Sequence, residues 1–427
     1  QKTGAFSTMT YSFPEGLPQI SMVVLDLRDP DRPGAILAAA GTPELQDGLS
    51  SWDLSALPYD ARSPVAPGSA AWTGINWHHT PGSVWKLLTA LALIDAATDG
   101  SLPPTDAAAL TSALKGLTAQ GADRLLGPDS LTGAEGICVP TTAAQGIKGA
   151  TLVSCGAGYH APIRDSDRGG PLRNGQGGSY GLRQAIGKSS NIWFVAAGMA
   201  METRQRPGQA ATEAAMTRTA RRLGLLDALP LDAKLAMGVM PRDPAQIDAD
   251  ALEGPEQMQA RAAATFGQRV KAGPLITAQL AASVALNRDV RPGLFAPMPR
   301  AEPLFSTPAA TLLLEHLRNG MHDVVNAGQI APQQGRGTAV AAFSARASAI
   351  RDRVSGKTGT ADSGLGDARI STFAGWMDNA DGAPAIAVSC SATVMGRRSG
   401  DSVSVPQLCA NAVAELMVRI DRSGALQ

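Results

Sequence analysis

The sequence predicts an α+β fold, in which an antiparallel sheet is flanked by helices and carries an inserted, mostly helical lobe. Two observations lead to this fold class. Short apolar runs separated by turn residues occur near both ends of the chain, whereas helical patterns dominate the middle. The early and late strands can share one sheet only if the chain returns to where it began. We therefore expect an irregular lead-in over 1–19 and one domain over 20–427, with the helical lobe inserted at roughly 98–340.

Apart from DRVSGKTGTA, each predicted strand is a short apolar run bounded by turn residues. The first two flank the turn sequence RDPDRPG and form a hairpin, and the other three follow late in the chain. An amphipathic pattern over 404–420 predicts a closing helix. The predicted strands are 20–27, 35–41, 352–361, 370–378 and 383–395.

A buried helix that contains a lysine is the first sign of chemistry. Residues 84–94 are apolar except at Lys86 and Thr89, which predicts a helix buried on all sides. A buried ammonium is costly without a partner, and burial lowers the pKa of a lysine. Ser83 lies three residues before Lys86 and on the same face of the helix. The pair fits a serine nucleophile with a neutral lysine as general base. The alternative is an ordinary serine at a helix start and a lysine that extends to solvent.

The composition excludes several classes of protein. Basic and acidic side chains both number 37, so no global field draws the chain to nucleic acid or to an anionic membrane. No apolar run approaches the roughly 18 residues that a membrane-spanning helix needs. The chain starts at Gln1 rather than Met, which we interpret as processing or a chosen boundary. An upstream signal or membrane anchor is therefore possible in the full-length protein.

The four cysteines fall into two pairs that are local in sequence, Cys138 with Cys155 and Cys390 with Cys409. The absence of a C-x-x-C motif argues against a zinc or redox site. Two disulfides in an oxidising compartment fit the spacing, and four buried thiols are the alternative. Of the two pairs, we favour Cys138–Cys155 as a disulfide because its surroundings have the composition of a loop.

Other residues near the motifs have plainer interpretations. His78 and His79 are adjacent and cannot face one metal ion from a regular element, and no third ligand is apparent, so no metal site is predicted. We interpret them as loop residues at the mouth of a cleft. Trp77, Trp85 and Trp193 either line a substrate groove or pack in the core, which is the commoner fate of tryptophan.

Two further motifs follow Ser83. Ser189 and Asn191 form an S-x-N in AIGKSSNIWF, and Lys357 begins the K-T-G of VSGKTGTA. Singly, the first could cap a helix and the second could form a turn. The order S-x-x-K, S-x-N and K-T-G is the signature of penicillin-binding proteins and serine β-lactamases.

On these motifs, the chain resembles the penicillin-binding transpeptidase family over roughly residues 20–420. The segments TPGSVWK, LRQAIGKSSNIWF, GPLITAQLAASVALN and GRGTA are similar to segments of that family. The resemblance implies the fold of DD-peptidases and serine β-lactamases. It also implies a reaction through an acyl-enzyme without a cofactor.

The resemblance assigns catalytic roles to five residues. Ser83 would be the nucleophile and Lys86 would take its proton, although the identity of the base is debated in this superfamily. Ser189 would bridge Lys86 and Lys357 and pass a proton to the leaving amine. Asn191 would bind the substrate amide and hold Lys86 in place.

The resemblance also assigns a substrate-binding role to the third motif. Lys357 and the hydroxyls of Thr358 and Thr360, on either side of Gly359, would bind the terminal carboxylate of the substrate. The absence of a side chain at Gly359 would let the substrate backbone come close. The N–H groups of Ser83 and Thr360 would form the oxyanion hole, in which each donor typically contributes about 100- to 1000-fold to the rate.

The implied activity is that of a periplasmic or otherwise extracytoplasmic DD-transpeptidase, anchored to the inner membrane in the full-length protein. It would cross-link peptidoglycan stem peptides ending in D-Ala-D-Ala and would be acylated by β-lactams. A DD-carboxypeptidase, which uses water as acceptor, would carry the same motifs. A β-lactamase would need a deacylation base such as the glutamate of E-x-x-L-N, which we do not find between Asn191 and Lys357. A non-enzymatic β-lactam sensor would keep the same residues.

Overall fold

The structure is a computed structural model that describes most of the chain in several segments. The described residues are 19–41, 79–116, 138–164, 181–293, 302–330, 336–362, 369–394 and 407–426, with short gaps at 30, 32, 142–149, 156–158, 204–212, 228, 231–240, 243 and 425. The predicted lead-in over 1–19 lies outside these residues, apart from Gln19.

A five-stranded antiparallel sheet lies at the centre, with the strand order β10-β11-β12-β1-β2. The first hairpin pairs with the last strand of the late group, because β1 and β12 run antiparallel side by side. This arrangement confirms the predicted fold class, in which the chain returns to the sheet that it began. The strands are β1 (Gln19–Asp26), β2 (Ala35–Gly41), β10 (Val354–Asp362), β11 (Arg369–Asp378) and β12 (Pro384–Val394).

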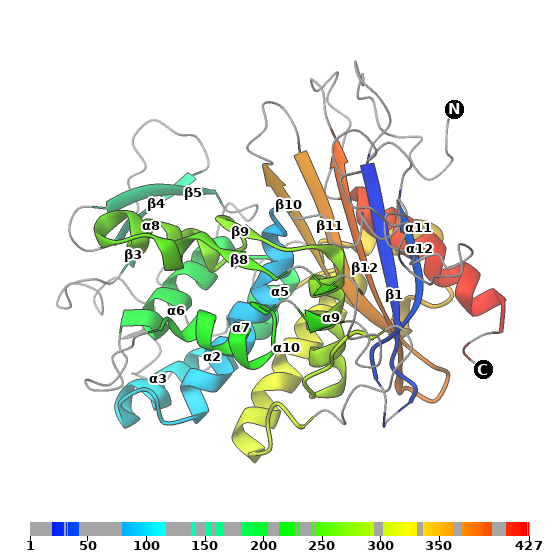
Figure 1. Ribbon diagram of the computed structural model, residues 1–427, viewed down its shortest axis with the longest axis horizontal. Helices are drawn as coiled ribbons and strands as arrows, with labels where there is room; N and C mark the ends of the chain where they lie inside the picture. The colour runs from blue at the N-terminus through cyan, green and yellow to red at the C-terminus, as the bar shows by residue number, and fades with distance from the viewer. Residues whose placement is uncertain are drawn as a thin grey trace.

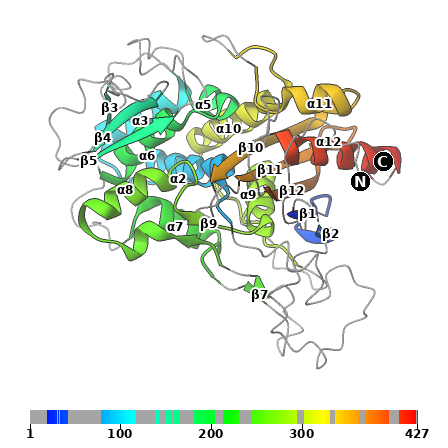
Figure 2. The ribbon, with the colours of Figure 1, turned by 90° about the horizontal axis from the view of Figure 1, so that it is seen from above.

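Helices cover both faces of this sheet (Figures 1 and 2). On one face, α9 (Pro274–Leu286) contacts β1, β11 and β12. On the other, α12 (Gln407–Arg422) contacts β11 and β12, and α11 (Val340–Arg346) packs against α12. The predicted closing helix is α12, which buries one side against the sheet.

The inserted lobe is built around α2 (Lys86–Thr98), which contacts α3, α6, α7 and α10. Apart from Asp95 and Thr98, its residues are all buried, as the apolar run predicts. The 3-10 turns η4 (Gly82–Trp85), η8 (Asp248–Ala251) and η9 (Arg351–Arg353) link neighbouring elements. The other helices of the lobe are α3 (Pro104–Lys115), α5 (Leu182–Lys188), α6 (Asn191–Thr203), α7 (Ala215–Arg222), α8 (Gly254–Ala264) and α10 (Pro308–Asn326).

The lobe also contains a three-stranded antiparallel sheet that the sequence does not predict. It lies within the long, Gly-rich stretch over 98–180, which we interpret from the sequence as an insertion to which no purpose is assigned, and it packs near α6 and α8 (Figure 1). Strands this short, between glycine-rich segments, carry too little periodicity to be recognised. Its strands are β3 (Cys138–Thr141), β4 (Ala150–Cys155) and β5 (Tyr159–Arg164). Two further pairs of two-residue strands are described, β6 (Leu229–Pro230) with β7 (Pro241–Arg242) and β8 (Gln246–Ile247) with β9 (Val270–Lys271).

The cysteine pairs differ from the sequence interpretation in one respect. Cys390 on β12 and Cys409 on α12 form a disulfide, with their Cα atoms 5.5 Å apart. Cys138 and Cys155 lie opposite each other on paired strands rather than in a loop, so the reason for favouring that pair was wrong. Their side chains lie outside the described residues.

None of the helices in the described segments combines the length and the apolar character needed to cross a bilayer.

Candidate active site

Ser83 lies in η4, which runs directly into α2 at Lys86. The Lys86 N–H donates a hydrogen bond to the Ser83 carbonyl, as expected in a 3-10 turn. Side chains three residues apart lie on the same side of such a turn, so Ser83 and Lys86 project to the same side. Ser83 is partly exposed, whereas Lys86 is completely buried.

Two glycines give the Ser83 turn its shape. Gly82 has a φ of +54°, and a Cβ atom there would lie 2.8 Å from the Thr360 carbonyl oxygen. Gly267 has a φ of +83°, and its Cβ atom would lie 1.8 Å from the Gly82 oxygen. Only glycine adopts such backbone conformations without strain. The turn is therefore packed between β10 and the loop that contains Gly267.

Lys86 extends from α2 toward the second motif. Its Nζ donates to the Ser189 carbonyl oxygen at 2.7 Å, to the Asn191 Oδ1 at 2.6 Å and to the Ser189 Oγ at 3.2 Å. Nζ also lies 5.5 Å from the centre of the Phe194 ring, a contact that favours a cation. The buried amine is therefore paired with polar groups, which offset the cost of burying a lysine in an apolar helix.

Ser189 lies between the two lysines of the site. It ends α5 with a φ of 59°, a left-handed conformation that is uncommon for a residue other than glycine. Its Oγ accepts from Lys86 at 3.2 Å and from Lys357 at 2.8 Å. Because both lone pairs of this oxygen are used by lysines, its own hydrogen is available to another acceptor.

Lys357 reaches Ser189 from β10. Its Nζ also donates to the Thr358 carbonyl oxygen at 2.7 Å, and the side chain is completely buried. Burial, and then the neighbouring charge of Lys86, hold the pKa of Lys357 well below its usual value. The depressed pKa thus belongs to the lysine for which the resemblance implies a charged role. A carboxylate bound beside Lys357 would favour its ammonium form.

Thr358 and Thr360 lie two residues apart on β10 and so share one face of the strand. The Thr358 hydroxyl hydrogen-bonds to the Thr338 hydroxyl at 2.6 Å, and Gln407 from α12 donates to the Thr338 carbonyl oxygen at 2.6 Å. Thr360 is exposed. Thr338 belongs to the GRGTA segment, and nothing in the sequence alone indicates this contact.

Gly359 lies beside the Ser83 turn. A Cβ atom at this position would lie 2.6 Å from the Pro81 oxygen, 3.2 Å from the Ser83 nitrogen and 2.2 Å from the Thr372 Oγ1. The sequence analysis attributes this glycine to the close approach of a substrate. The structure gives a different reason, because the space that a side chain would take is filled by the protein's own backbone and by Thr372.

The histidine and tryptophan residues near the motifs are placed largely in the core. His79 is 8% exposed and its ring hydrogen-bonds to Ser391, so its interpretation as a loop residue at a cleft mouth was wrong. Trp85 and Trp193 are buried, in agreement with the packing alternative. His78 and Trp77 lie outside the described residues.

Comparison with known proteins gives a match at the level of structure. No protein-family profile and no curated protein matches the sequence. The structure is similar to that of a penicillin-binding protein, PBP2, in complex with MreC from Helicobacter pylori, with a TM-score of 0.57 and 17% sequence identity. This chain has the fold of a penicillin-binding protein transpeptidase domain. The match covers 99% of this chain and 62% of the Helicobacter pylori chain.

A second solved structure is similar to this penicillin-binding protein fold. It is the apo TP domain of penicillin-binding protein 3 from Burkholderia pseudomallei, with a TM-score of 0.49 and 16% identity over 97% of this chain and 91% of that chain. At such identities, likeness establishes the fold alone. The chemistry is argued from the side chains of this chain.

Proposed function

We propose that this protein is a serine acyltransferase that acts on peptides ending in D-Ala-D-Ala, in the manner of a DD-transpeptidase, and that β-lactams acylate it. One observation carries the proposal, the Ser189 hydroxyl shared by Lys86 and Lys357 beside the Ser83 turn. These lysines lie 103 and 168 residues from Ser189 in the sequence. Two buried amines joined through one hydroxyl form a path for protons, which a purely structural contact does not need.

In the first step, Ser83 Oγ would attack the carbonyl carbon of the peptide bond between the two D-alanines. The Oγ proton passes to a neutral lysine amine, a role that we assign to Lys86 because it lies one turn after Ser83. The new C–O bond leaves negative charge on the former carbonyl oxygen. The N–H groups of Ser83 and Thr360 are the donors that we assign to this oxygen, because Gly82 packs directly against Thr360.

In the second step, the C–N bond breaks and the leaving D-alanine nitrogen needs a proton. Ser189 Oγ–H donates this proton, and a lysine ammonium that is hydrogen-bonded to Ser189 replaces it. The product is an ester between Ser83 and the shortened peptide. The amine of a second peptide then attacks the ester carbonyl carbon, so that a C–N bond forms and the bond to Ser83 Oγ breaks. The proton that the amine loses returns to Ser83 Oγ through the lysine base, which completes transpeptidation.

A β-lactam would react by the same first step. Its amide nitrogen belongs to the ring, so the leaving group stays attached to the acyl-enzyme. Lys357 is the side chain that we assign to the carboxylate common to both ligands, since it is buried and cationic when a carboxylate lies beside it. Asn191 accepts a hydrogen bond from Lys86 Nζ at 2.6 Å, and we assign its side-chain amide to the amide of the substrate as well.

The same proposal places the protein in an extracytoplasmic compartment. The disulfide between Cys390 and Cys409 supports this, because disulfides persist mainly in oxidising compartments. A membrane anchor upstream of the chain stays a prediction.

Release of D-alanine from a synthetic peptide ending in D-Ala-D-Ala tests the proposal. We expect the wild type to release D-alanine and, with an added amino acceptor, to form the transfer product detected by mass spectrometry. Ser83→Ala should do neither. Ser101→Ala, which alters a buried serine beyond the far end of α2, is the control and should behave as the wild type. Release without transfer would instead favour a DD-carboxypeptidase, and no release would contradict the proposed activity.

A further inference from the structure

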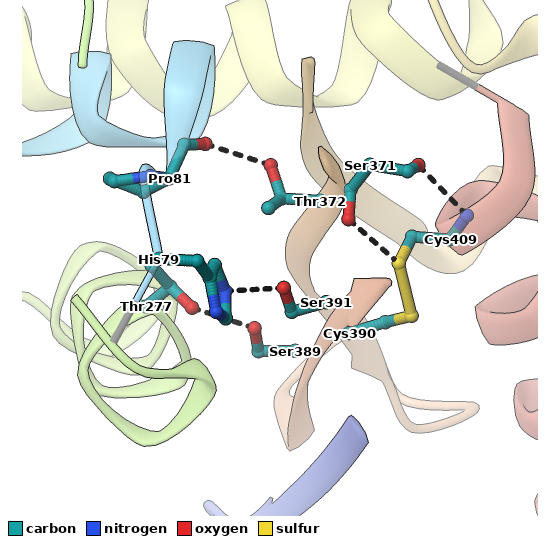
Figure 3. Close-up of a disulfide and its surroundings, with 9 residues drawn as sticks. All are labelled: His79, Pro81, Thr277, Ser371, Thr372, Ser389, Cys390, Ser391 and Cys409. Atoms are coloured by element: carbon teal, nitrogen blue, oxygen red, sulfur yellow. Dashed lines mark hydrogen bonds between the residues drawn. A yellow bond between two sulfur atoms is a disulfide. The ribbon is translucent and has the colours of Figure 1, made fainter. Parts of the chain in front are cut away.

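A row of small residues crosses the sheet beneath the Ser83 turn. Gly359, Thr372 and Ser391 lie opposite one another on β10, β11 and β12, so their side-chain positions share one face of the sheet. Figure 3 shows the hydroxyls of Thr372 and Ser391 directed at the segment that leads to Ser83. This face would be expected to carry apolar side chains, because it packs against helices. The hydroxyls at these positions therefore need an explanation.

Thr372 makes the contact nearest to the nucleophile. Its Oγ1 donates to the Pro81 carbonyl oxygen at 2.8 Å, across 291 residues of sequence, and its side chain is 3% exposed. Pro81 lies two residues before Ser83 and forms the N-cap of η4. The bond thus ties β11 to the first residue of the catalytic turn.

Because Gly359 has no side chain, the Thr372 hydroxyl can reach the Pro81 carbonyl oxygen. A Cβ atom at residue 359 would lie 2.2 Å from Thr372 Oγ1 and 2.6 Å from the Pro81 oxygen. Any side chain there would occupy the place of the bond. The hydrogen bond from Thr372 on β11 to the Ser83 turn therefore requires glycine at residue 359, the position opposite Thr372 on β10.

His79 holds the same segment at its start. Its ring hydrogen-bonds to the Ser391 hydroxyl, which lies next to Thr372 across the sheet. Its backbone forms an antiparallel bridge with Ala272. The segment is therefore fixed at two points, at His79 and at Pro81, immediately before Gly82 and Ser83.

The other face of the same strands is braced. Cys390 precedes Ser391 and is bonded to Cys409 of α12, whose backbone N–H donates to the Ser371 hydroxyl at 3.2 Å (Figure 3). In the sequence, Ser371 directly precedes Thr372, and Cys390 directly precedes Ser391. The disulfide thus fixes the strands from which Thr372 and Ser391 reach the turn.

We propose that Thr372 is a positioning residue for Ser83, which sets the place of the nucleophile and of its N–H through the Pro81 carbonyl. The inference rests on the proposed function for its catalytic consequence. Its structural part, that Thr372 orders the turn, stands without that function. A displacement of about 1 Å in such a site can cost roughly 100-fold in rate.

The test compares three variants. Thr372→Val removes the hydroxyl and keeps the shape, and Thr372→Ser restores a hydroxyl. Thr277→Val is the matched control, because Thr277 is 4% exposed and its Oγ1 hydrogen-bonds to Ser389 at 2.7 Å on the same face of the sheet, but from α9 rather than from the turn. For each protein, the rate of acylation is measured as a function of the concentration of a fluorescent penicillin, which gives a half-saturating concentration and a maximal rate. Hydrogen exchange is measured on peptides covering 79–94.

We expect Thr372→Val to lower the maximal acylation rate by about 10- to 100-fold, with little change in the half-saturating concentration. Exchange over 79–94 should become faster in this variant. Thr372→Ser should recover most of the rate, and Thr277→Val should change neither measurement even if it lowers the melting temperature equally.

Two results would overturn the inference. One is exchange over 79–94 that is unchanged in Thr372→Val, and the other is faster exchange with a wild-type acylation rate. If penicillin does not acylate the wild type, the proposed function fails, and hydrogen exchange alone decides whether Thr372 orders the turn.

Discussion

At the scale of single residues, the candidate site is a chain of hydrogen bonds that joins three separate motifs. The Ser189 Oγ accepts from Lys86 Nζ at 3.2 Å and from Lys357 Nζ at 2.8 Å. Lys86 and Lys357 are buried, so their amines interact far more strongly than they would in water. Each residue can be tested by a change that removes one function and spares the others.

Replacing Lys86 should affect the chemical step more than binding. We expect Lys86→Ala to slow acylation by penicillin by about 100- to 10,000-fold, with a smaller change in the half-saturating concentration, because proton transfer rather than a carboxylate contact is lost. The time course of acylation by a fluorescent penicillin, followed at several concentrations, gives both the acylation rate and the half-saturating concentration. Lys115→Ala, at the end of α3, is the control. Acylation of Lys86→Ala at nearly the wild-type rate would move the base role to another group.

Binding of a carboxylate ligand should depend on pH through Lys357. Burial and Lys86 lower the pKa of Lys357, so its ammonium is lost at a lower pH than that of an ordinary lysine. The half-saturating concentration of penicillin should therefore rise as pH rises through this depressed pKa. Lys357→Arg keeps its charge throughout and should give a flat profile, with whatever affinity the new shape allows. A flat profile in the wild type would contradict the charge role of Lys357.

At the scale of secondary-structure elements, the disulfide between β12 and α12 should be a major source of stability. It closes a loop with a sequence separation of 19, for which chain-entropy estimates give about 3 kcal/mol. Cys390→Ala with Cys409→Ala should lower the free energy of unfolding by roughly this amount in urea titrations. A reductant should lower the stability of the wild type and leave that of the double variant unchanged. Equal effects of the reductant on both would contradict the prediction.

The elements show how far the sequence determines the fold. The strands β1, β2, β10, β11 and β12 and the helices α2 and α12 follow from the pattern of apolar residues, and the structure places them within a few residues of the predicted bounds. The strands β3 to β5 were missed because their short runs lie among glycines. The contacts from Thr338 and Thr372 were also out of reach. The contact of Thr372 depends on the sheet register, and that of Thr338 depends on how the segment before α11 packs against β10.

In the candidate site too, some features could be predicted from the sequence and others could not. The motifs name Ser83, Lys86, Ser189, Asn191 and Lys357, because each residue type carries recognisable chemistry at a fixed spacing. The burial of His79 and its bond to Ser391 could not be foreseen, because a lone histidine in a loop has no pattern to read. Sequence therefore indicates the candidate reacting groups, and the structure adds the groups that hold these residues in place.

At the scale of the whole molecule, one carboxyl group should make stability depend on pH. Asp378 ends β11, and burial raises its pKa to about 6 despite opposing effects of Trp376 and of His322, Arg318 and Arg353. A carboxyl with a raised pKa in the folded state contributes stability that is complete below pH 3.8 and is lost as pH rises through about 6.

Asp378→Asn cannot ionise, so it should gain stability relative to the wild type between about pH 4 and pH 7. Because Asp378 is only partly buried, we expect a gain on the order of 1 kcal/mol. Urea titrations of both proteins at several pH values measure the difference. A difference that stays constant with pH, or that falls as pH rises, would contradict the assignment.

The central claim is that the Ser83 turn, the shared Ser189 hydroxyl and Lys357 together form an acyl-transfer site, and one measurement tests it most directly. The protein is incubated with penicillin, its intact mass is followed over time, and the modified peptide is sequenced by mass spectrometry. The account predicts one adduct, located on Ser83, absent from Ser83→Ala and lasting for hours, because the sequence between Asn191 and Lys357 lacks an E-x-x-L-N segment to supply a deacylation base. An adduct that persists in Ser83→Ala, or no adduct on the wild type, would contradict the claim. Loss of the adduct within seconds, with release of penicilloic acid, would make a β-lactamase the better description.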